Sequence, residues 1–197
     1  MFLDLDGIDV LVVGGGRIGA RKAAGLAAAG ARVRLVATEV SDHVRALRGD
    51  EACAEVIEAA FEPHHLEGIR LVVTATGEHD VDQRISEAAR SAGIWTNAAD
   101  QPVDCEFILP AIARSGRVTV AVSTDGASPA LARWLRDQVS LLLDERVAVA
   151  AERLAAERRE VQAAGGSTED IDWTPRLREL GLVGWCDRPG CPVAAGD

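Results

Sequence analysis

The sequence predicts an α/β fold, with an N-terminal domain built on a parallel, doubly wound sheet, a small α+β element and a helical C-terminal region. Short apolar runs alternate with helix-favouring segments over the first half of the chain. A glycine-rich turn joins the first apolar run to a helix. After Asp100 the pattern changes to short β-branched runs, and then to charged, alanine-rich segments.

Apolar runs, and residues that favour the beginning or end of a helix, predict the N-terminal strands and helices. Val10 to Val13 is a continuous apolar run, as a strand covered on both faces requires. Gly30 and Gly93 end helices, and Asp80 and Ser41 are expected to begin them. The expected strands are 10–13, 32–36, 54–58, 71–75 and 94–98, and the expected helices are 20–29, 41–47 and 80–92.

The second half of the chain predicts a small antiparallel element followed by helices. Two short extended pieces, 107–110 and 111–114, precede a turn at Ser115 and Gly116 and a β-branched strand at 118–122. Ser128 and Pro129 form a good helix start. The expected helices are 130–143, 144–164 and 175–180, and residues 187–197 are expected to be frayed.

Composition excludes several classes of protein. The chain has 197 residues, 48% hydrophobic and 26% charged, which argues against a disordered or fibrous protein. No apolar run approaches the roughly 18 residues that span a bilayer, and the first six residues lack a positive region. We therefore expect no membrane partner and a cytoplasmic location. The net charge of −10 and the scarcity of aromatic residues argue against nucleic-acid binding.

No metal site is expected. The four cysteines, Cys53, Cys105, Cys186 and Cys191, do not supply a closed zinc set, and we interpret them as reduced thiols. The four histidines, His43, His64, His65 and His79, lack zinc-binding spacing and are expected in loops or on the surface.

The glycine-rich turn predicts dinucleotide binding. Gly14 permits the tight turn, Gly16 lets a pyrophosphate approach the backbone, and Gly19 lets helix and strand pack closely. The helix N-terminus then offers free N–H groups to phosphates. This pattern, between a strand and a helix, is typical of a Rossmann domain. The expected cofactor contacts are Gly14, Gly15, Gly16, Arg17, Ile18, Gly19, Thr38, Glu39 and Thr76.

Glu39 and Thr38, after the second strand, are the candidates for the adenosine ribose hydroxyls. An acid there favours NAD over NADP because it would repel a 2′-phosphate. Arg17 could still accept a phosphate, and Glu39 could be only a solvated loop acid.

Three segments resemble the precorrin-2 dehydrogenase family, the dehydrogenase (in some members also ferrochelatase) module of sirohaem synthase. They occur in the family's order and cover roughly residues 2 to 143. The segments are Val12–Ala23 with the preceding Leu3–Gly7, Asn97–Pro102 leading into Phe107–Ala111, and Ala121–Arg133.

This resemblance implies oxidation of precorrin-2 to sirohydrochlorin with NAD, a homodimer, and Asp100 as the catalytic carboxylate. The position of Asp100 after the fifth strand, where a doubly wound sheet opens its ligand crevice, agrees with that role. Without the resemblance, a loop acid that caps a turn before Pro102 is the favoured interpretation of Asp100. The implied domains are 1–114 for NAD, 115–144 for dimerisation and 145–197 for the helical region.

The substrate is then a tetrapyrrole with eight carboxylates. Hydroxyls and N–H groups of Ser123, Thr124 and Ser128 at a helix start suit a carboxylate, although a capped helix alone explains them too. Arginine pairs with carboxylates, so Arg114, Arg117, Arg133 and Arg136 are candidates, with ordinary surface charge as the alternative. Two other functions stay open: iron or cobalt insertion at Asp100, and a non-enzymatic NAD-sensing module.

Overall fold

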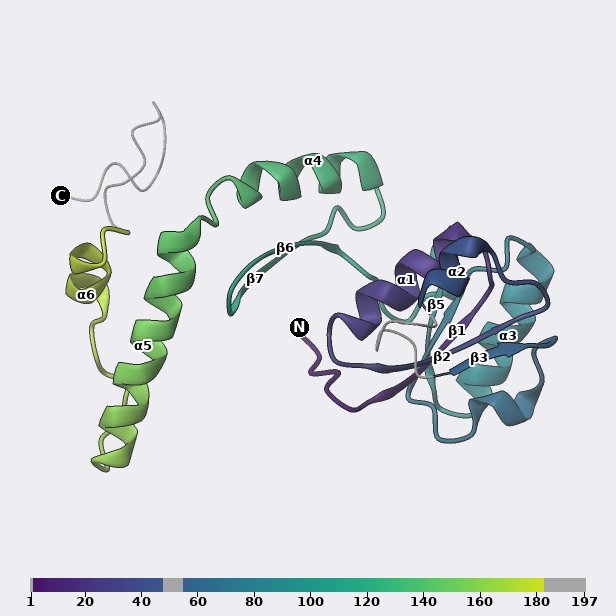
Figure 1. The fold of residues 1–197 in the computed structure, drawn as a ribbon, viewed down its shortest axis with the longest axis horizontal. Coiled ribbons are helices and arrows are strands. Elements are labelled where there is room, and N and C mark those ends of the chain that lie inside the picture. Colours follow the sequence, from purple (N-terminus) through teal and green to yellow (C-terminus); the bar gives the residue numbers. More distant parts are fainter. Residues whose placement is uncertain (1, 48–54, 183–197) are drawn as a thin grey trace. The chain divides into compact units, whose positions relative to one another are not determined.

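The computed structural model describes residues 2–47 and 55–182, and these form two compact units (Figure 1). The first unit is Met1–Leu109 and the second is Pro110–Asp197. The first domain was expected to extend to residue 114, whereas the first compact unit ends at Leu109. The first strand of the small antiparallel element therefore lies in the second unit. Among the described residues, every helix is too short or too polar to cross a bilayer.

The first unit is built on a five-stranded parallel sheet. Its strands, in spatial order, are β3 (Glu55–Glu58), β2 (Arg32–Ala37), β1 (Asp9–Val13), β4 (Leu71–Thr74) and β5 (Trp95–Ala98). The chain winds outward from β1 to β3 and then crosses to β4 on the other side of β1. The carboxyl ends of β1 and β4 therefore flank the point where the winding reverses, which is where ligands bind in open α/β sheets.

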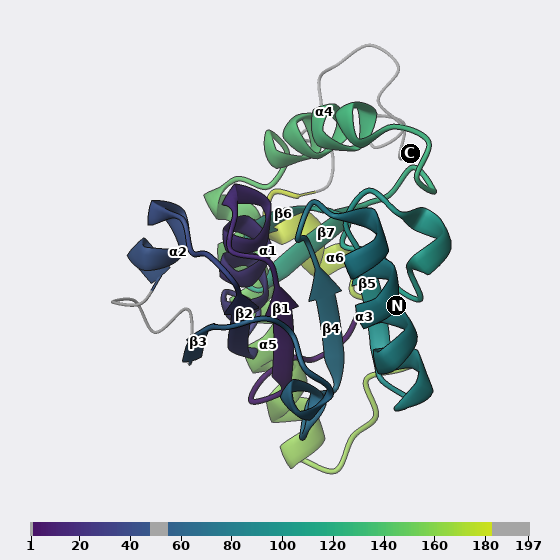
Figure 2. The same cartoon turned by 90° about the vertical axis from the view of Figure 1, so that its right-hand side faces the viewer.

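Helices cover both faces of this sheet, because alternate residues of each buried strand face opposite ways (Figures 1 and 2). Val10 and Val12 pack with α1 (Arg17–Ala27) and α2 (Asp42–Leu47) on one face. Leu11 and Val13 pack with α3 (His79–Ser91) on the other. Short 3-10 turns, η1 (Pro63–Leu66) and η2 (Pro102–Asp104), complete the unit. The fold is the predicted doubly wound sheet.

The second unit contains the predicted antiparallel pair and three helices. β6 (Ala111–Ser115) pairs with β7 (Val118–Val122), and α4 (Pro129–Ser140), α5 (Glu145–Ala163) and α6 (Thr174–Glu179) follow. Ser128 caps α4, since its Oγ accepts the N–H of Leu131 at 3.2 Å. Asp144 caps α5 by accepting the N–H groups of Arg146 and Val147.

Several local expectations are corrected. The helix after β4 begins at His79, so Asp80 lies in its first turn and is not the cap. His65 lies in η1 but is only 5% exposed, so it is not a surface histidine. Residues 107–110 form no strand. Cys53, Cys186, Cys191 and residues 187–197 lie outside the described residues.

Candidate functional site

A cavity of about 550 Å³ opens at the carboxyl ends of β1, β4 and β5. It lies at the reversal of the winding, within the first unit. Three segments line it: the start of α1, the loop from β4 into α3, and the loop after β5. The lining residues are Gly16, Arg17, Ile18, Ala75, Thr76, Gly77, His79, Asp82, Ala99, Asp100 and Gln101.

Gly14 and Gly19 of the glycine-rich turn are closely packed against backbone atoms, whereas Gly16 borders open space. A Cβ on Gly14, whose φ is +126°, would stand 2.2 Å from the carbonyl oxygen of Ala75. A Cβ on Gly19 would stand 2.0 Å from the carbonyl oxygen of Gly14, so α1 packs directly on the end of β1. No atom lies within 4 Å of where a Cβ on Gly16 would be. The turn thus leaves space at the position where a pyrophosphate would approach.

The first turn of α1 faces this space with unpaired donors. The N-cap residue Gly16 has no side chain, so no cap hydrogen bond covers the first N–H groups of the helix. Arg17 and Ile18 line the cavity beside them. Free N–H groups, the helix dipole and an arginine together make a site for an anion.

Asp82 holds the opposite wall of the cavity in place. The residue is 2% exposed, and its Oδ1 accepts the backbone N–H of Thr76 at 3.2 Å and the hydroxyl of Thr76 at 2.9 Å. The role of Asp82 was not predicted from the sequence. The signal was present, because Asp82 falls on the buried stripe of α3 with Ile85, Ser86 and Ala89, where an acid is out of place.

Asp100 lines the same cavity as the glycine-rich turn. It is exposed, and its φ of +60° is a left-handed conformation that costs energy for a residue with a Cβ. The next residue, Gln101, lines the cavity too, and its Oε1 is buried without a hydrogen-bond partner in the described structure. The loop after β5 thus brings the carboxylate-bearing residue Asp100 to the cavity.

Thr38 and Glu39 follow β2 and are both exposed. Neither lines the cavity. The backbone of Glu39 packs on the turn, because a Cβ on Gly15 would stand 1.9 Å from the carbonyl oxygen of Glu39. The position of Glu39 beside the glycine-rich turn suits the part of a dinucleotide that lies beyond the pyrophosphate.

The remaining candidates belong to the second unit. Thr124 Oγ1 donates to the carbonyl oxygen of Ser128 and accepts its N–H, both at 3.1 Å, and Ser123 Oγ accepts the N–H of Asp125 at 3.2 Å. These hydroxyls shape the turn before α4, in which Asp125 has a φ of +52°. These hydroxyls therefore serve the turn and the helix cap, as the simpler interpretation predicts. A role in ligand binding stays a prediction.

The candidate arginines differ in their surroundings. Arg117 lies 3.8 Å from Glu152, and Arg136 donates to Asp137 at 2.7 Å. Arg114 and Arg133 are exposed, on β6 and α4. The described residues hold no group of three or more His, Cys, Asp or Glu side chains placed to bind a metal ion.

Comparison with protein-family models matches two parts of the chain. Residues 1–111 match the family described as putative NAD(P)-binding, and residues 116–140 match the central segment of sirohaem biosynthesis proteins. The first match covers more than half of the chain, which therefore belongs to the family described as putative NAD(P)-binding. The order of the two matches agrees with the three resembling segments of the sequence.

Two siroheme synthases are similar to most of this chain. A siroheme synthase of Nitrosomonas europaea is 38% identical over 162 residues, 82% of this chain and 34% of that protein. Siroheme synthase 1 of Aeromonas salmonicida is 35% identical over 198 residues, the whole chain and 41% of that protein. The chain thus spans about a third to two fifths of the length of these relatives.

Among solved structures, SirC, a precorrin-2 dehydrogenase, superimposes with a TM-score of 0.71. It is 26% identical, and the match covers 93% of this chain and 87% of that one. The similarity therefore includes both compact units of the chain.

Proposed function

We propose that the protein oxidises precorrin-2 to sirohydrochlorin with NAD as the hydride acceptor. One observation carries the proposal: Asp100 and the phosphate-binding turn line a single cavity at the reversal of the sheet. The match to SirC over most of both chains supports it.

The residues of the first unit fit a dinucleotide. The free N–H groups at the start of α1, with Arg17, would hold the pyrophosphate, and the open side of Gly16 admits it. Thr76 lies in the opposite wall of the cavity, and Thr38 and Glu39 would reach the adenosine ribose. The carboxylate of Glu39 favours NAD over NADP in this proposal because it would repel a 2′-phosphate.

Asp100 is the proposed catalytic base. When bound, oxidised NAD accepts a hydride from the substrate, and the oxidation is completed when one proton leaves as well. The carboxylate of Asp100 takes that proton, and its position at the cavity puts it within reach of a ligand there.

The second unit would bind the carboxylates of the tetrapyrrole. We assign Ser123, Thr124 and Ser128 at the start of α4 to this task, because that helix end offers N–H groups and hydroxyls. Arg114, Arg117 and Arg133 would supply the positive charge, which a chain of net charge −10 must provide locally.

We also propose a homodimer that forms through the second unit, and a cytoplasmic location. The second unit exposes several large apolar side chains, as a protein–protein interface does. They are Ile112, Leu131, Trp134, Leu141, Val149 and Ile171. The free thiol of Cys105 fits a reducing compartment.

The test is to mix purified protein, precorrin-2 and NAD and to follow the visible spectrum together with the absorbance of NADH. We expect one NADH for each precorrin-2 oxidised. NAD binding without any change of the tetrapyrrole spectrum would contradict the proposal and would favour a cofactor-sensing module. A parallel reaction of sirohydrochlorin with ferrous iron measures whether the same site also inserts metal.

A further inference from the structure

A hydrogen-bonded group lies behind the loop that carries Asp100. Lys22 of α1 donates from Nζ to the side-chain oxygen of Asn97 at 3.0 Å, across 75 positions of sequence. Asn97 Nδ2 donates to the carbonyl oxygen of Phe107 at 2.8 Å and lies 3.5 Å from the sulfur of Cys105. The amide of Asn97 therefore joins α1 to both ends of the loop between β5 and residue 107.

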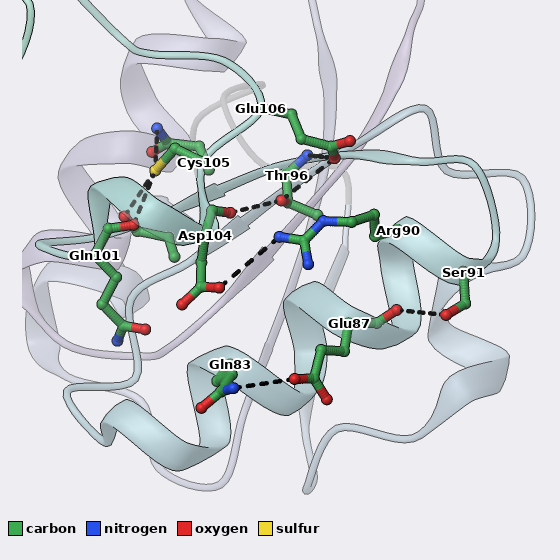
Figure 3. Close-up of polar contacts among 11 residues, drawn as sticks. Gln83, Glu87, Arg90, Ser91, Thr96, Gln101, Asp104, Cys105 and Glu106 are labelled. Carbon is green, nitrogen blue, oxygen red and sulfur yellow. Dashed lines mark hydrogen bonds and ion pairs between the residues drawn. The ribbon is translucent and has the colours of Figure 1, made fainter.

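The thiol of Cys105 fastens the same loop from inside. Its Sγ lies 3.2 Å from the carbonyl oxygen of Ala98 and 3.4 Å from that of Gln101. These two carbonyls stand on either side of Asp100 in the chain, and Figure 3 shows the sulfur of Cys105 beside the backbone of Gln101. The strained backbone of Asp100 is thus held by a thiol that is itself held by Asn97.

Further hydrogen bonds support this loop. The hydroxyl of Thr96 donates to the carbonyl oxygen of Asp104 at 2.9 Å, and the N–H of Thr96 donates to Glu106 Oε2 at 3.1 Å (Figure 3). These bonds tie the far part of the loop to β5. The part that bears Asp100 is held by the N–H of Ala99, which donates to the carbonyl oxygen of Thr74 at 2.9 Å, and by the thiol of Cys105, which Asn97 joins to Lys22.

Lys22 differs from the other basic residues of the chain in type and in surroundings. It is the only lysine of the chain, in which the other 20 basic residues are arginine. It is half-buried, and it does not line the cavity. Burial, with a smaller effect of the neighbouring Arg21, lowers the pKa of its ammonium, whereas Cys105 and Asp100 act to raise that pKa. A compact ammonium fits a single amide oxygen, where the planar fork of an arginine does not.

We propose that Lys22 is a positioning residue for Asp100. From outside the cavity, its ammonium fixes, through the amide of Asn97 and the thiol of Cys105, the loop that presents the carboxylate. The part of this inference that concerns turnover rests on the proposed function, whereas the coupling between Lys22 and the loop does not.

The coupling is tested in the free protein by NMR. Because Lys22 is the only lysine, protein labelled with ¹³C,¹⁵N-lysine gives one side-chain signal that needs no assignment. We expect this signal to titrate below an ordinary lysine, and Asp100→Asn to lower the midpoint further, since it removes a negative charge that favours the ammonium. Glu87→Gln, a charge removal on the exposed face of α3, serves as the control and leaves the midpoint in place.

The effect on turnover is tested with a matched pair of variants. Lys22→Met removes the ammonium at the half-buried position, and Arg21→Met removes one positive charge from the adjacent exposed position. We expect Lys22→Met to lower kcat by about 10- to 100-fold while the KM for NAD changes less than about threefold. Arg21→Met should keep the wild-type kcat. Melting temperatures of both variants separate this effect from loss of the fold.

If Lys22→Met fails to fold, the variant Lys22→Arg tests the proposal instead, because arginine keeps the positive charge. We expect it to fold and still to show a lowered kcat. The inference is overturned if Lys22→Met or a folded Lys22→Arg has wild-type kcat, or if the lysine signal is the same in wild type and Asp100→Asn. Absence of precorrin-2 oxidation by the wild type would instead refute the proposed function, and the NMR comparison would still decide the coupling.

Discussion

Gly16 and Gly19 stand three residues apart in one turn, yet a methyl group would act differently at the two positions. At Gly16 the backbone is extended, with a φ of −80°, and the space is open. At Gly19 the methyl group would meet the carbonyl oxygen of Gly14 at 2.0 Å. The first glycine leaves room for a ligand, whereas the second lets α1 pack on β1.

We therefore expect Gly16→Ala to weaken NAD binding by about tenfold or more with little change in stability, because the added methyl group fills space that the pyrophosphate needs. Gly19→Ala should lower the free energy of unfolding by about 1–3 kcal/mol, because helix and strand must separate. Urea unfolding and calorimetric titration with NAD measure the two quantities. Equal loss of stability in both variants would contradict this division of roles.

His65 makes stability depend on pH. Its Nδ1 accepts the N–H of Glu62 at 2.9 Å, so the buried ring is neutral. Burial, with a smaller effect of the neighbouring His64, lowers the pKa of His65 below its ordinary value. The unfolded chain then takes up a proton more readily than the folded one, so stability is full above the ordinary histidine pKa and falls as pH drops through the lowered one.

We expect the urea midpoint of the wild type to fall between about pH 7.5 and pH 5, and His65→Asn, which keeps an acceptor but does not titrate, to reduce that fall. A fall of the same size in the variant would assign the pH dependence to other groups.

At the scale of elements, the start of α4 combines a structural and a proposed binding task in Ser128. Its hydroxyl accepts the N–H of Leu131, and this bond would be kept by an aspartate, which is also a good N-cap residue. A carboxylate at this position would repel the carboxylates of a tetrapyrrole. The two substitutions of Ser128 therefore separate the two tasks.

We expect Ser128→Ala to destabilise the protein by about 0.5–2 kcal/mol and Ser128→Asp to keep the wild-type stability. Ser128→Asp should raise the KM for precorrin-2 and leave the KM for NAD unchanged. Thermal unfolding and steady-state kinetics check both expectations. An unchanged KM for precorrin-2 in Ser128→Asp would remove Ser128 from the proposed substrate site.

The sequence could predict those elements whose formation depends on residues close together in the chain. The buried strands, the glycine-rich turn and the Ser128 cap depend on residues a few positions apart. The cap at Asp80 was wrong because the loop before α3 is organised by Thr76 and by Asp82, one turn into the helix. The hydrogen bond between Lys22 and Asn97 joins residues 75 positions apart, and no sequence pattern could predict it.

At the scale of the whole molecule, association is expected to depend on the apolar side chains of the second unit. Leu131, Trp134 and Leu141, at helical spacing along and just after α4, are 47%, 57% and 63% exposed. Sedimentation should show a dimer for the wild type and a monomer for Trp134→Glu. Trp95→Glu is the control, since Trp95 is 48% exposed on the first unit. A Trp134→Glu variant that remains dimeric would exclude this surface as the interface.

The proposed oxidation depends on the carboxylate of Asp100, and the variant Asp100→Asn removes its charge and its ability to take up a proton. Asparagine tolerates the left-handed backbone of this position, so the loop should be kept. We predict that kcat for precorrin-2 oxidation falls by about 100-fold or more, while the dissociation constant for NAD changes less than about threefold. A variant that binds NAD normally and oxidises precorrin-2 at the wild-type rate would contradict the account.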